Sequence, residues 1–172
     1  MGPRRVHLPG RVTRPRRADR VAEIAIAEYG AAAGEVLLDT HVWVGLLAPD
    51  VFTLPAATLR RLLTAQENGA LCVPDVAIWE IALKAGKGSL PLRQSPRSWL
   101  DRARTAPGTR TIPFSAEMMI RTAELPAGAP PDPFDRAIIA TALVEVIPLV
   151  TADRRIIDWA RRTRALDVLP AR

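Results

Sequence analysis

The 172-residue chain is poor in cysteine, histidine and lysine. The single cysteine, Cys72, cannot form an internal disulfide, and one thiol does not make a zinc site. A chain without disulfides is typical of a reducing compartment, so we expect a cytoplasmic protein. No apolar run approaches the roughly 20 residues of a transmembrane helix, so we expect no membrane-spanning segment.

Basic charge is concentrated at the start of the chain. Residues 1–34 hold seven arginines against three acidic residues, whereas the rest of the chain holds 17 basic and 15 acidic side chains. Residues 1–34 are predicted to be a basic, disordered extension, with a short amphipathic helix in residues 18–33. The Arg16-Arg17 pair is not an export signal, because charged residues follow where an apolar stretch is required. Residues 35–172 are expected to form one globular domain.

Beyond this extension, short apolar runs alternate with segments of helical periodicity. This alternation is typical of a parallel sheet covered by helices on both faces, so the predicted fold class is α/β with about five strands. Asp75 is placed to cap one helix, and Pro96 takes the first-turn position of another. The expected strands are 36–38, 70–73, 111–112, 147–150 and 166–169, and the expected helices are 55–67, 75–85, 95–103, 115–123, 132–146 and one that begins after residue 153.

Four carboxylates stand out by their positions in this pattern. Asp39 ends the first strand and Asp153 follows the fourth, while Glu80 and Asp135 lie in helices among apolar residues. Asp132, three residues before Asp135, is a fifth candidate on the same helix face. Ligands of parallel α/β sheets bind beyond the carboxyl ends of the strands, where the two strand-end aspartates are expected to lie.

Each of these acids also has a structural explanation. The combination nevertheless favours a functional site, because acids among isoleucine, alanine and valine cost free energy unless something compensates them. The structural explanations are helix capping by Asp39, Asp132 and Asp153, and ion pairs of Glu80 with Lys84 and of Asp135 with Arg136.

If these acids lie close together, the repulsion between their negative charges must be compensated. Two carboxylates about 5 Å apart at an effective dielectric constant of about 20 repel by roughly 3 kcal/mol. Four clustered acids form several such pairs, so their repulsion approaches the ~5–15 kcal/mol stability of a whole domain. Either some of them are protonated or a cation lies among them. With so little histidine and cysteine, the donors are all oxygens, which suits Mg²⁺ or Mn²⁺ and phosphate chemistry.

Four sequence blocks that contain these acids resemble the motifs of PIN-domain ribonucleases, and most of all the VapC toxins of type II toxin–antitoxin systems. They occur in the order of the family and cover about residues 36–170. The blocks are LDTHVW at residues 38–43, WEIALK at 79–84, DPFDRAIIA at 132–140 and VTAD at 150–153.

The resemblance implies that residues 35–172 form a PIN domain, a three-layer α/β/α fold with a central, mainly parallel sheet. It also implies an endoribonuclease that depends on Mg²⁺ or Mn²⁺ and leaves 5′-phosphate and 3′-hydroxyl ends. The matching positions give Asp39, Glu80, Asp135 and Asp153 as catalytic acids. Among these, Asp39 and Asp135 are expected to be direct metal ligands, with Glu80, Asp153 and Asp132 supporting the site.

The resemblance further implies supporting residues and partners. Thr40 and Thr151 match positions that support the acids by hydrogen bonds. Lys84 and Arg136 are the basic residues nearest to the acids in sequence, and they are candidate contacts to RNA phosphates. The expected partners are a VapB- or Phd-like antitoxin and a second copy of the chain. Pro130-Pro131 is a departure, because relatives often carry a histidine or basic residue there.

A catalytically silent PIN-like module that binds RNA or protein is the alternative function. Other residues are given structural roles. The four tryptophans lie on apolar faces and are expected to pack in the core, and His41 is interpreted as a polar residue after a strand. Cys72, within a strand, is expected to be a buried small apolar residue.

Overall fold

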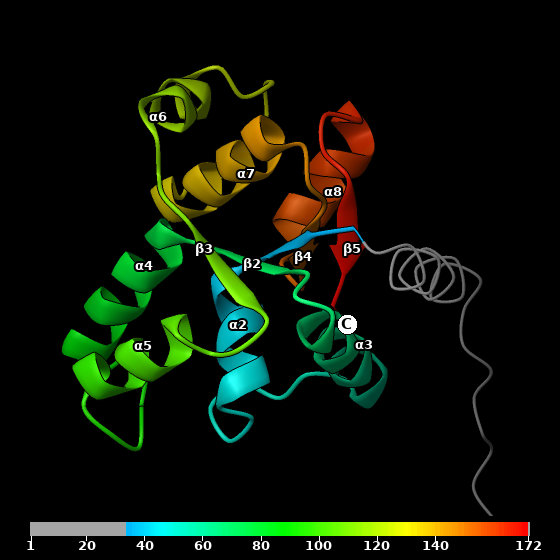
Figure 1. The fold of residues 1–172 in the computed structure, drawn as a ribbon. Helices are drawn as coiled ribbons and strands as arrows, with labels where there is room; N and C mark the ends of the chain where they lie inside the picture. Colours follow the sequence, from blue (N-terminus) through cyan, green and yellow to red (C-terminus); the bar gives the residue numbers. More distant parts are fainter. Residues whose placement is uncertain (1–33, 172) are drawn as a thin grey trace, which may run out of the picture.

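The computed structural model describes residues 34–171, so the predicted disordered extension and its short helix lie outside the described residues. Twelve helices and strands follow one another in this part of the chain (Figure 1). They are β1 (Val36–Leu38), α2 (Thr40–Leu47), α3 (Ala56–Glu67), β2 (Leu71–Pro74), α4 (Asp75–Gly86), α5 (Pro96–Arg104), β3 (Thr109–Ile112), α6 (Ala116–Ala123), α7 (Pro133–Glu145), β4 (Leu149–Thr151), α8 (Arg154–Thr163) and β5 (Val168–Pro170).

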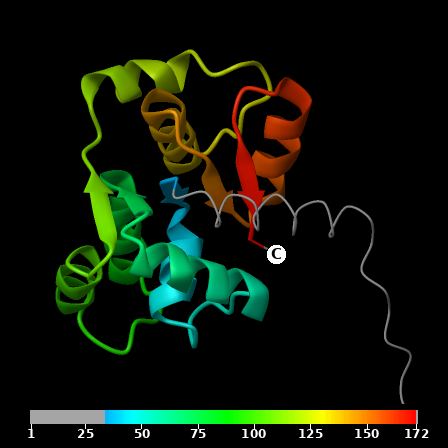
Figure 2. The same ribbon diagram turned by 45° about the vertical axis from the view of Figure 1, so that its right-hand side comes forward.

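The five strands form one sheet in the order β3-β2-β1-β4-β5, and every neighbouring pair is parallel. Figure 2 shows β3 and β5 at the two edges of this sheet. The predicted α/β class with about five strands is therefore confirmed. The order reverses between β1 and β4, and such a reversal opens a crevice beyond the carboxyl ends of these two strands.

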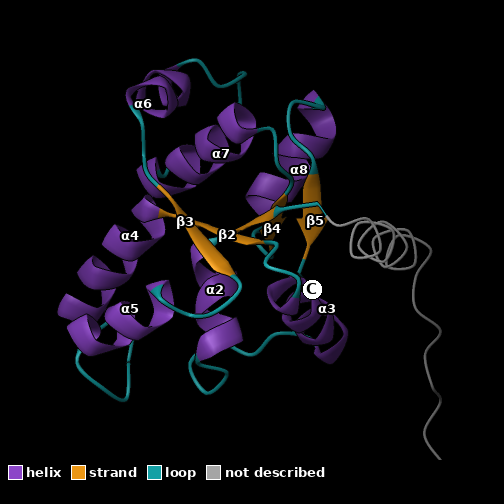
Figure 3. Ribbon diagram, in the orientation of Figure 1, coloured by secondary structure: helices purple, strands orange, loops and turns teal. Residues whose placement is uncertain are grey.

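Helices cover both faces of the sheet, which gives three layers (Figure 3). Side chains alternate between faces along each strand, so Leu38 packs toward one helical layer and Leu37 toward the other. The first layer includes residues of α2, α3 and α5, with Trp43 and Trp99 in edge-to-face contact. The second includes residues of α6, α7 and α8, and Cys72 is buried among them as expected.

The expected strands and helices agree with the structure to within a few residues, apart from two differences at helix starts. Helix α2 follows β1 directly and has no counterpart among the helix ranges expected from the sequence. The predicted cap at Asp75 is wrong, because Pro74 precedes the helix and α4 begins at Asp75 itself. The Asp75 carboxylate therefore lies in the first turn, where it interacts favourably with the helix dipole. In the described part of the chain, no helix is long and apolar enough to cross a membrane.

Gly108 holds the loop before β3 close to the end of α3. Its φ is +73°, and a Cβ added there would lie 1.8 Å from the backbone oxygen of Gln66. The side-chain Nε2 of Gln66 also donates to the Pro107 carbonyl at 3.0 Å, so two segments 41 residues apart meet here. Gly69 has a similar φ of +69°, but a Cβ there would meet no atom within 4 Å.

We expect Gly108→Ala to destabilise the fold more than Gly69→Ala. Both variants place an L-residue in the left-handed region, at about 1–2 kcal/mol. Gly108→Ala adds a steric clash with backbone, worth about 1–3 kcal/mol more. Urea unfolding of the two variants measures the difference, and equal losses would show that the α3–β3 contact is not tight.

Candidate active site

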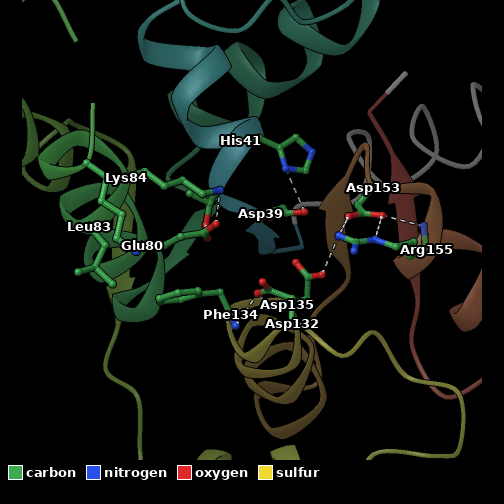
Figure 4. Close-up of a pocket in the computed structure, with 12 residues that line it drawn as sticks. Asp39, His41, Glu80, Leu83, Lys84, Asp132, Phe134, Asp135, Asp153 and Arg155 are labelled. Carbon is green, nitrogen blue, oxygen red and sulfur yellow. Dashed lines mark hydrogen bonds and ion pairs between the residues drawn. The ribbon is translucent and has the colours of Figure 1, made fainter. Parts of the chain in front are cut away.

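A pocket of about 280 Å³ opens beyond the carboxyl ends of β1 and β4 (Figure 4). Its walls come from the starts of α2, α7 and α8 and from one face of α4. It contains five carboxylates and three cationic side chains. The lining residues are Asp39, Thr40, His41, Glu80, Leu83, Lys84, Lys87, Asp132, Phe134, Asp135, Asp153 and Arg155.

Asp39 is the most deeply placed acid of the pocket. It directly follows β1, and the pairing of Leu38 with Val150 brings it beside Thr151 on β4. The Thr151 hydroxyl donates a hydrogen bond to Asp39 Oδ2, and the Asp39 carboxylate makes no capping bond to α2. Only 3% of Asp39 is exposed, so the strand register itself places a buried carboxylate at the base of the pocket.

Glu80 enters the pocket from α4 and is also almost buried, with 9% exposed. The Thr40 hydroxyl donates to its Oε2 at 2.6 Å, and Lys84 Nζ lies 2.5 Å from its Oε1. Thr40 begins α2, so this bond joins the start of α2 to the middle of α4. Both oxygens of Glu80 are therefore paired with donors from the chain.

The start of α7 supplies the next two acids. Asp132 caps this helix, because its Oδ1 accepts hydrogen bonds from the amides of Phe134 at 2.9 Å and Asp135 at 3.2 Å. Asp135 lies in the first turn and points toward Asp39 and Asp153 (Figure 4). Burial, and then the negative charges of Asp39, Asp132 and Asp153, raise the pKa of Asp135 to about 7, although Arg155 opposes this. Negative charge is thus crowded around Asp135.

Asp153 caps α8 and forms an ion pair with an arginine of the same helix. Its Oδ1 accepts from the Arg155 amide at 2.7 Å, and its Oδ2 accepts from the guanidinium at 2.8 Å. These bonds to Arg155 lower the pKa of Asp153. The same guanidinium lies 3.2 Å from Asp135 Oδ2, so Arg155 bridges the two acids.

His41 contacts the acids from the first turn of α2. Its Nε2 accepts from the Ala152 amide at 3.1 Å, and its Nδ1 lies 3.4 Å from Asp39 Oδ2. Burial opposes the charged ring, but the hydrogen bond to Asp39 and the charges of Asp39, Asp153 and Glu80 raise its pKa. The amide donor at Nε2 favours the neutral Nδ1–H tautomer, which can donate to Asp39. The sequence analysis interpreted His41 only as a polar residue after a strand and did not predict its contact with Asp39.

The acids predicted from the sequence all line one pocket, together with Thr40 and Lys84, and Thr151 bonds to Asp39. Arg136, the other predicted RNA contact, is not among the residues that line the pocket. Its guanidinium donates to the carbonyl of Thr122 and, at 3.4 Å, to that of Pro130, so it holds the loop before α7 instead of lining the pocket.

Other residues at or beside the pocket were not predicted from the sequence either. Arg155 and Lys87 line it, although their sequence surroundings are typical of solvated positions. Trp79 is 60% exposed on α4, so its prediction as a core residue is wrong, whereas the other three tryptophans are buried as expected. Whether the Trp79 side chain is exposed depends on how α4 packs against α7, and the sequence of α4 alone does not specify that packing.

The donor chemistry of the pocket suits a hard divalent cation, since all five acids offer oxygen ligands. The contacts to Asp39 from Thr151 and His41 and the contact to Asp135 from Arg155 all engage the Oδ2 atom of these acids. Among the described residues, however, no three such side chains form a preassembled metal-binding group. Lys84 and Arg155 instead bind the carboxylates directly.

A parallel three-layer α/β fold with an acidic crevice at its β1–β4 reversal defines the class of this protein. Residues 36–162 match the PIN domain family, and the chain therefore belongs to that family. It is 33% identical over 121 residues to Ribonuclease VapC22 of Mycobacterium tuberculosis, a match that covers 70% of this chain and 88% of the relative.

Two solved structures share the fold. VapBC2 of Rickettsia felis, bound to a DNA fragment from its promoter, matches with a TM-score of 0.57 and 20% identity over 77% of this chain and 96% of that chain. DNA-bound VapBC of Salmonella typhimurium matches with a TM-score of 0.57 and 17% identity over 78% of this chain and 96% of that chain. The predicted PIN-like architecture is confirmed by these likenesses.

We expect Asp135→Asn to stabilise the protein at alkaline pH. Between the ordinary pKa of about 4 and a folded pKa of about 7, the unfolded chain loses a proton that the folded chain keeps. Stability of the wild type therefore falls as pH rises through this range, by up to about 4 kcal/mol, and the asparagine variant avoids that loss.

Urea unfolding at pH 8 and pH 4 measures this difference. The variant should be about 1–4 kcal/mol more stable at pH 8 and nearly equal to the wild type at pH 4. Asp158→Asn, at an exposed position on α8, is the matched control and should change stability little at either pH. A gain that is the same at both pH values would contradict the raised pKa.

Proposed function

We propose that this protein is a divalent-metal-dependent endoribonuclease and the toxin of a VapBC-like type II toxin–antitoxin system. The observation that carries the proposal is the convergence of Asp39, Glu80, Asp135 and Asp153 on one pocket of a PIN-domain chain. The name of the relative Ribonuclease VapC22 supports the same activity. The expected products carry 5′-phosphate and 3′-hydroxyl ends.

Asp39 and Asp135 are the residues that would hold Mg²⁺ or Mn²⁺ directly, with Glu80, Asp153 and Asp132 supporting the site. A bound ion of this kind neutralises phosphate charge, activates water and stabilises the leaving oxygen. Crowded negative charge around Asp135, which raises its pKa, is what such a cation would relieve.

The chain's own residues have separate tasks in this proposal. Thr151 orients Asp39 and Thr40 orients Glu80 through their hydroxyl donors. Lys84, paired with Glu80, remains 52% exposed at its side chain, and Arg155 is 62% exposed at its side chain. Both cations can therefore turn toward an RNA phosphate when the carboxylates bind metal. Arg136 is not carried into the proposal, because its guanidinium is bound to backbone carbonyls.

We expect Asp39→Asn to lower RNA cleavage by at least about 100-fold. Removal of a residue that only hydrogen-bonds to a metal ligand already lowers metal affinity or activity by about 10–100-fold, and Asp39 is proposed to be a ligand itself. The substitution is nearly isosteric, so the circular dichroism spectrum and unfolding midpoint should show an intact fold. Asp158→Asn is the control that should keep full cleavage.

Sequencing of RNA ends completes this test. The wild type in Mg²⁺ or Mn²⁺ should produce 5′-phosphate ends that the Asp39→Asn variant does not, and chelation by EDTA should abolish them. Full activity of Asp39→Asn, or 2′,3′-cyclic phosphate ends, would overturn the mechanism. A wild type that binds RNA but cleaves none in either metal would favour the silent binding module.

An antitoxin of the VapB or Phd type is the proposed partner, and a homodimer is the proposed assembly. The two structural neighbours are themselves VapBC proteins. A basic side chain from the antitoxin would find a net acidic pocket, because five carboxylates face three cations there.

We expect a short DNA-binding protein encoded beside this gene to copurify with the chain and to inhibit its cleavage. Inhibition should weaken at high salt, because the contact is electrostatic. Affinity purification from cells that express both genes, followed by the cleavage assay, measures this. A neighbouring protein that neither binds nor inhibits would remove the toxin assignment and leave the nuclease assignment intact.

A further inference from the structure

Trp79 differs from the other tryptophans of the described chain. Trp43, Trp99 and Trp159 are at most 6% exposed, whereas Trp79 is 60% exposed. Tryptophan offers a large apolar face, and leaving it in water forgoes the burial that stabilises the other three. Such an exposed aromatic side chain at a pocket is more informative than a scattered surface leucine.

The position of Trp79 ties it to the acidic pocket. Its ring packs edge-to-face against Phe134, with ring centroids 4.8 Å apart and an interplanar angle of 65°. Phe134 lines the pocket, as do Glu80, the next residue, and Leu83, one turn further along α4. Figure 4 shows Leu83 and Phe134 on the α4 side of the acids. Trp79 does not itself line the pocket but lies beside its apolar rim of Leu83 and Phe134, which it contacts through Phe134.

Cations lie on the same rim. Lys84 and Lys87 follow Trp79 on or just after α4, and both line the pocket. They are the only two lysines in the entire chain. An exposed aromatic face near exposed cations is the arrangement by which proteins bind single-stranded nucleic acid, with bases stacked on the ring and phosphates held by charge.

We propose that Trp79, braced by Phe134, is a stacking site for one unpaired nucleobase of RNA beside the scissile phosphate. This inference rests on the proposed ribonuclease function and adds to it a residue that positions the RNA. The site recognises that a base is unpaired and not which base it is, because every base has a π face.

The surroundings of Trp79 favour a nucleobase over a protein partner. The pocket beside Trp79 is lined by the charged residues Glu80, Lys84 and Lys87, and interface cores are depleted of such residues. Met119 and Ile120, by contrast, are adjacent exposed apolar residues on α6, at 55% and 57% exposure, and neither lines the pocket. They provide the matched surface for a control.

The test measures binding of a fluorescently labelled eight-nucleotide RNA of mixed sequence to the protein in Mg²⁺, with Asp39→Asn in the background to prevent cleavage. Trp79→Ala and Trp79→Leu should weaken binding by about 5- to 100-fold, because stacking contributes ~1–3 kcal/mol per base. Leucine keeps apolar bulk but has no π face. Trp79→Phe should retain most of the affinity, and Ile120→Ala should retain all of it.

Intrinsic fluorescence gives a second, direct readout. The single-stranded RNA should quench the tryptophan emission, and the Trp79→Phe variant should lose this quenching because its remaining tryptophans are buried. The same RNA annealed to its complement should quench little. Equal quenching by the duplex, or wild-type affinity of Trp79→Leu, would overturn the stacking site.

Sedimentation separates the protein-partner outcome. If Trp79→Ala converts a dimer to a monomer, Trp79 is buried between copies and the stacking proposal is wrong. The experiments also distinguish failure of the stacking site from failure of the nuclease function. Cleavage by the wild type without quenching removes only the stacking site, whereas quenching without cleavage in any metal removes only the nuclease.

Discussion

Mutual repulsion among carboxylates is the constraint on which the rest of the structure depends. Parallel pairing of β1 with β4 places Asp39 beside Thr151, and Asp153 follows two residues later. Asp135 completes the cluster from α7, and its pKa is raised first by burial and then by the negative charges of the neighbouring acids. A cluster of this kind opposes folding, so the surrounding packing must hold it together. Such a cluster, which lowers the stability of the folded protein, is typical of a binding or catalytic site.

The free protein meets this constraint with its own cations. Arg155 bridges Asp135 and Asp153, and Lys84 neutralises Glu80. Both side chains remain more than half exposed, so neither is locked in place by packing. These cations are therefore held by ion pairs and not by packing, and under the proposed function the same side chains would contact a bound phosphate.

Much of the site was predictable from the sequence because strand ends and helix starts fix backbone position, and Asp39, Asp132 and Asp153 occupy such positions. What could not be predicted depends on packing between elements. Whether Trp79 is covered depends on the angle between α4 and α7, and the reach of Arg155 to Asp135 depends on how α8 faces α7. The cap expected at Asp75 failed because Pro74 is the last residue of β2 and leaves no separate capping residue.

The acids of the pocket come from four segments spread between residues 39 and 153, and β4 lies between β1 and β5 in the sheet. During synthesis, therefore, the first acid emerges more than one hundred residues before the last. A growing chain that ends before β4 lacks both the partner strand that positions Asp39 and the helix that carries Arg155. The pocket can therefore assemble only when nearly the entire domain has been translated.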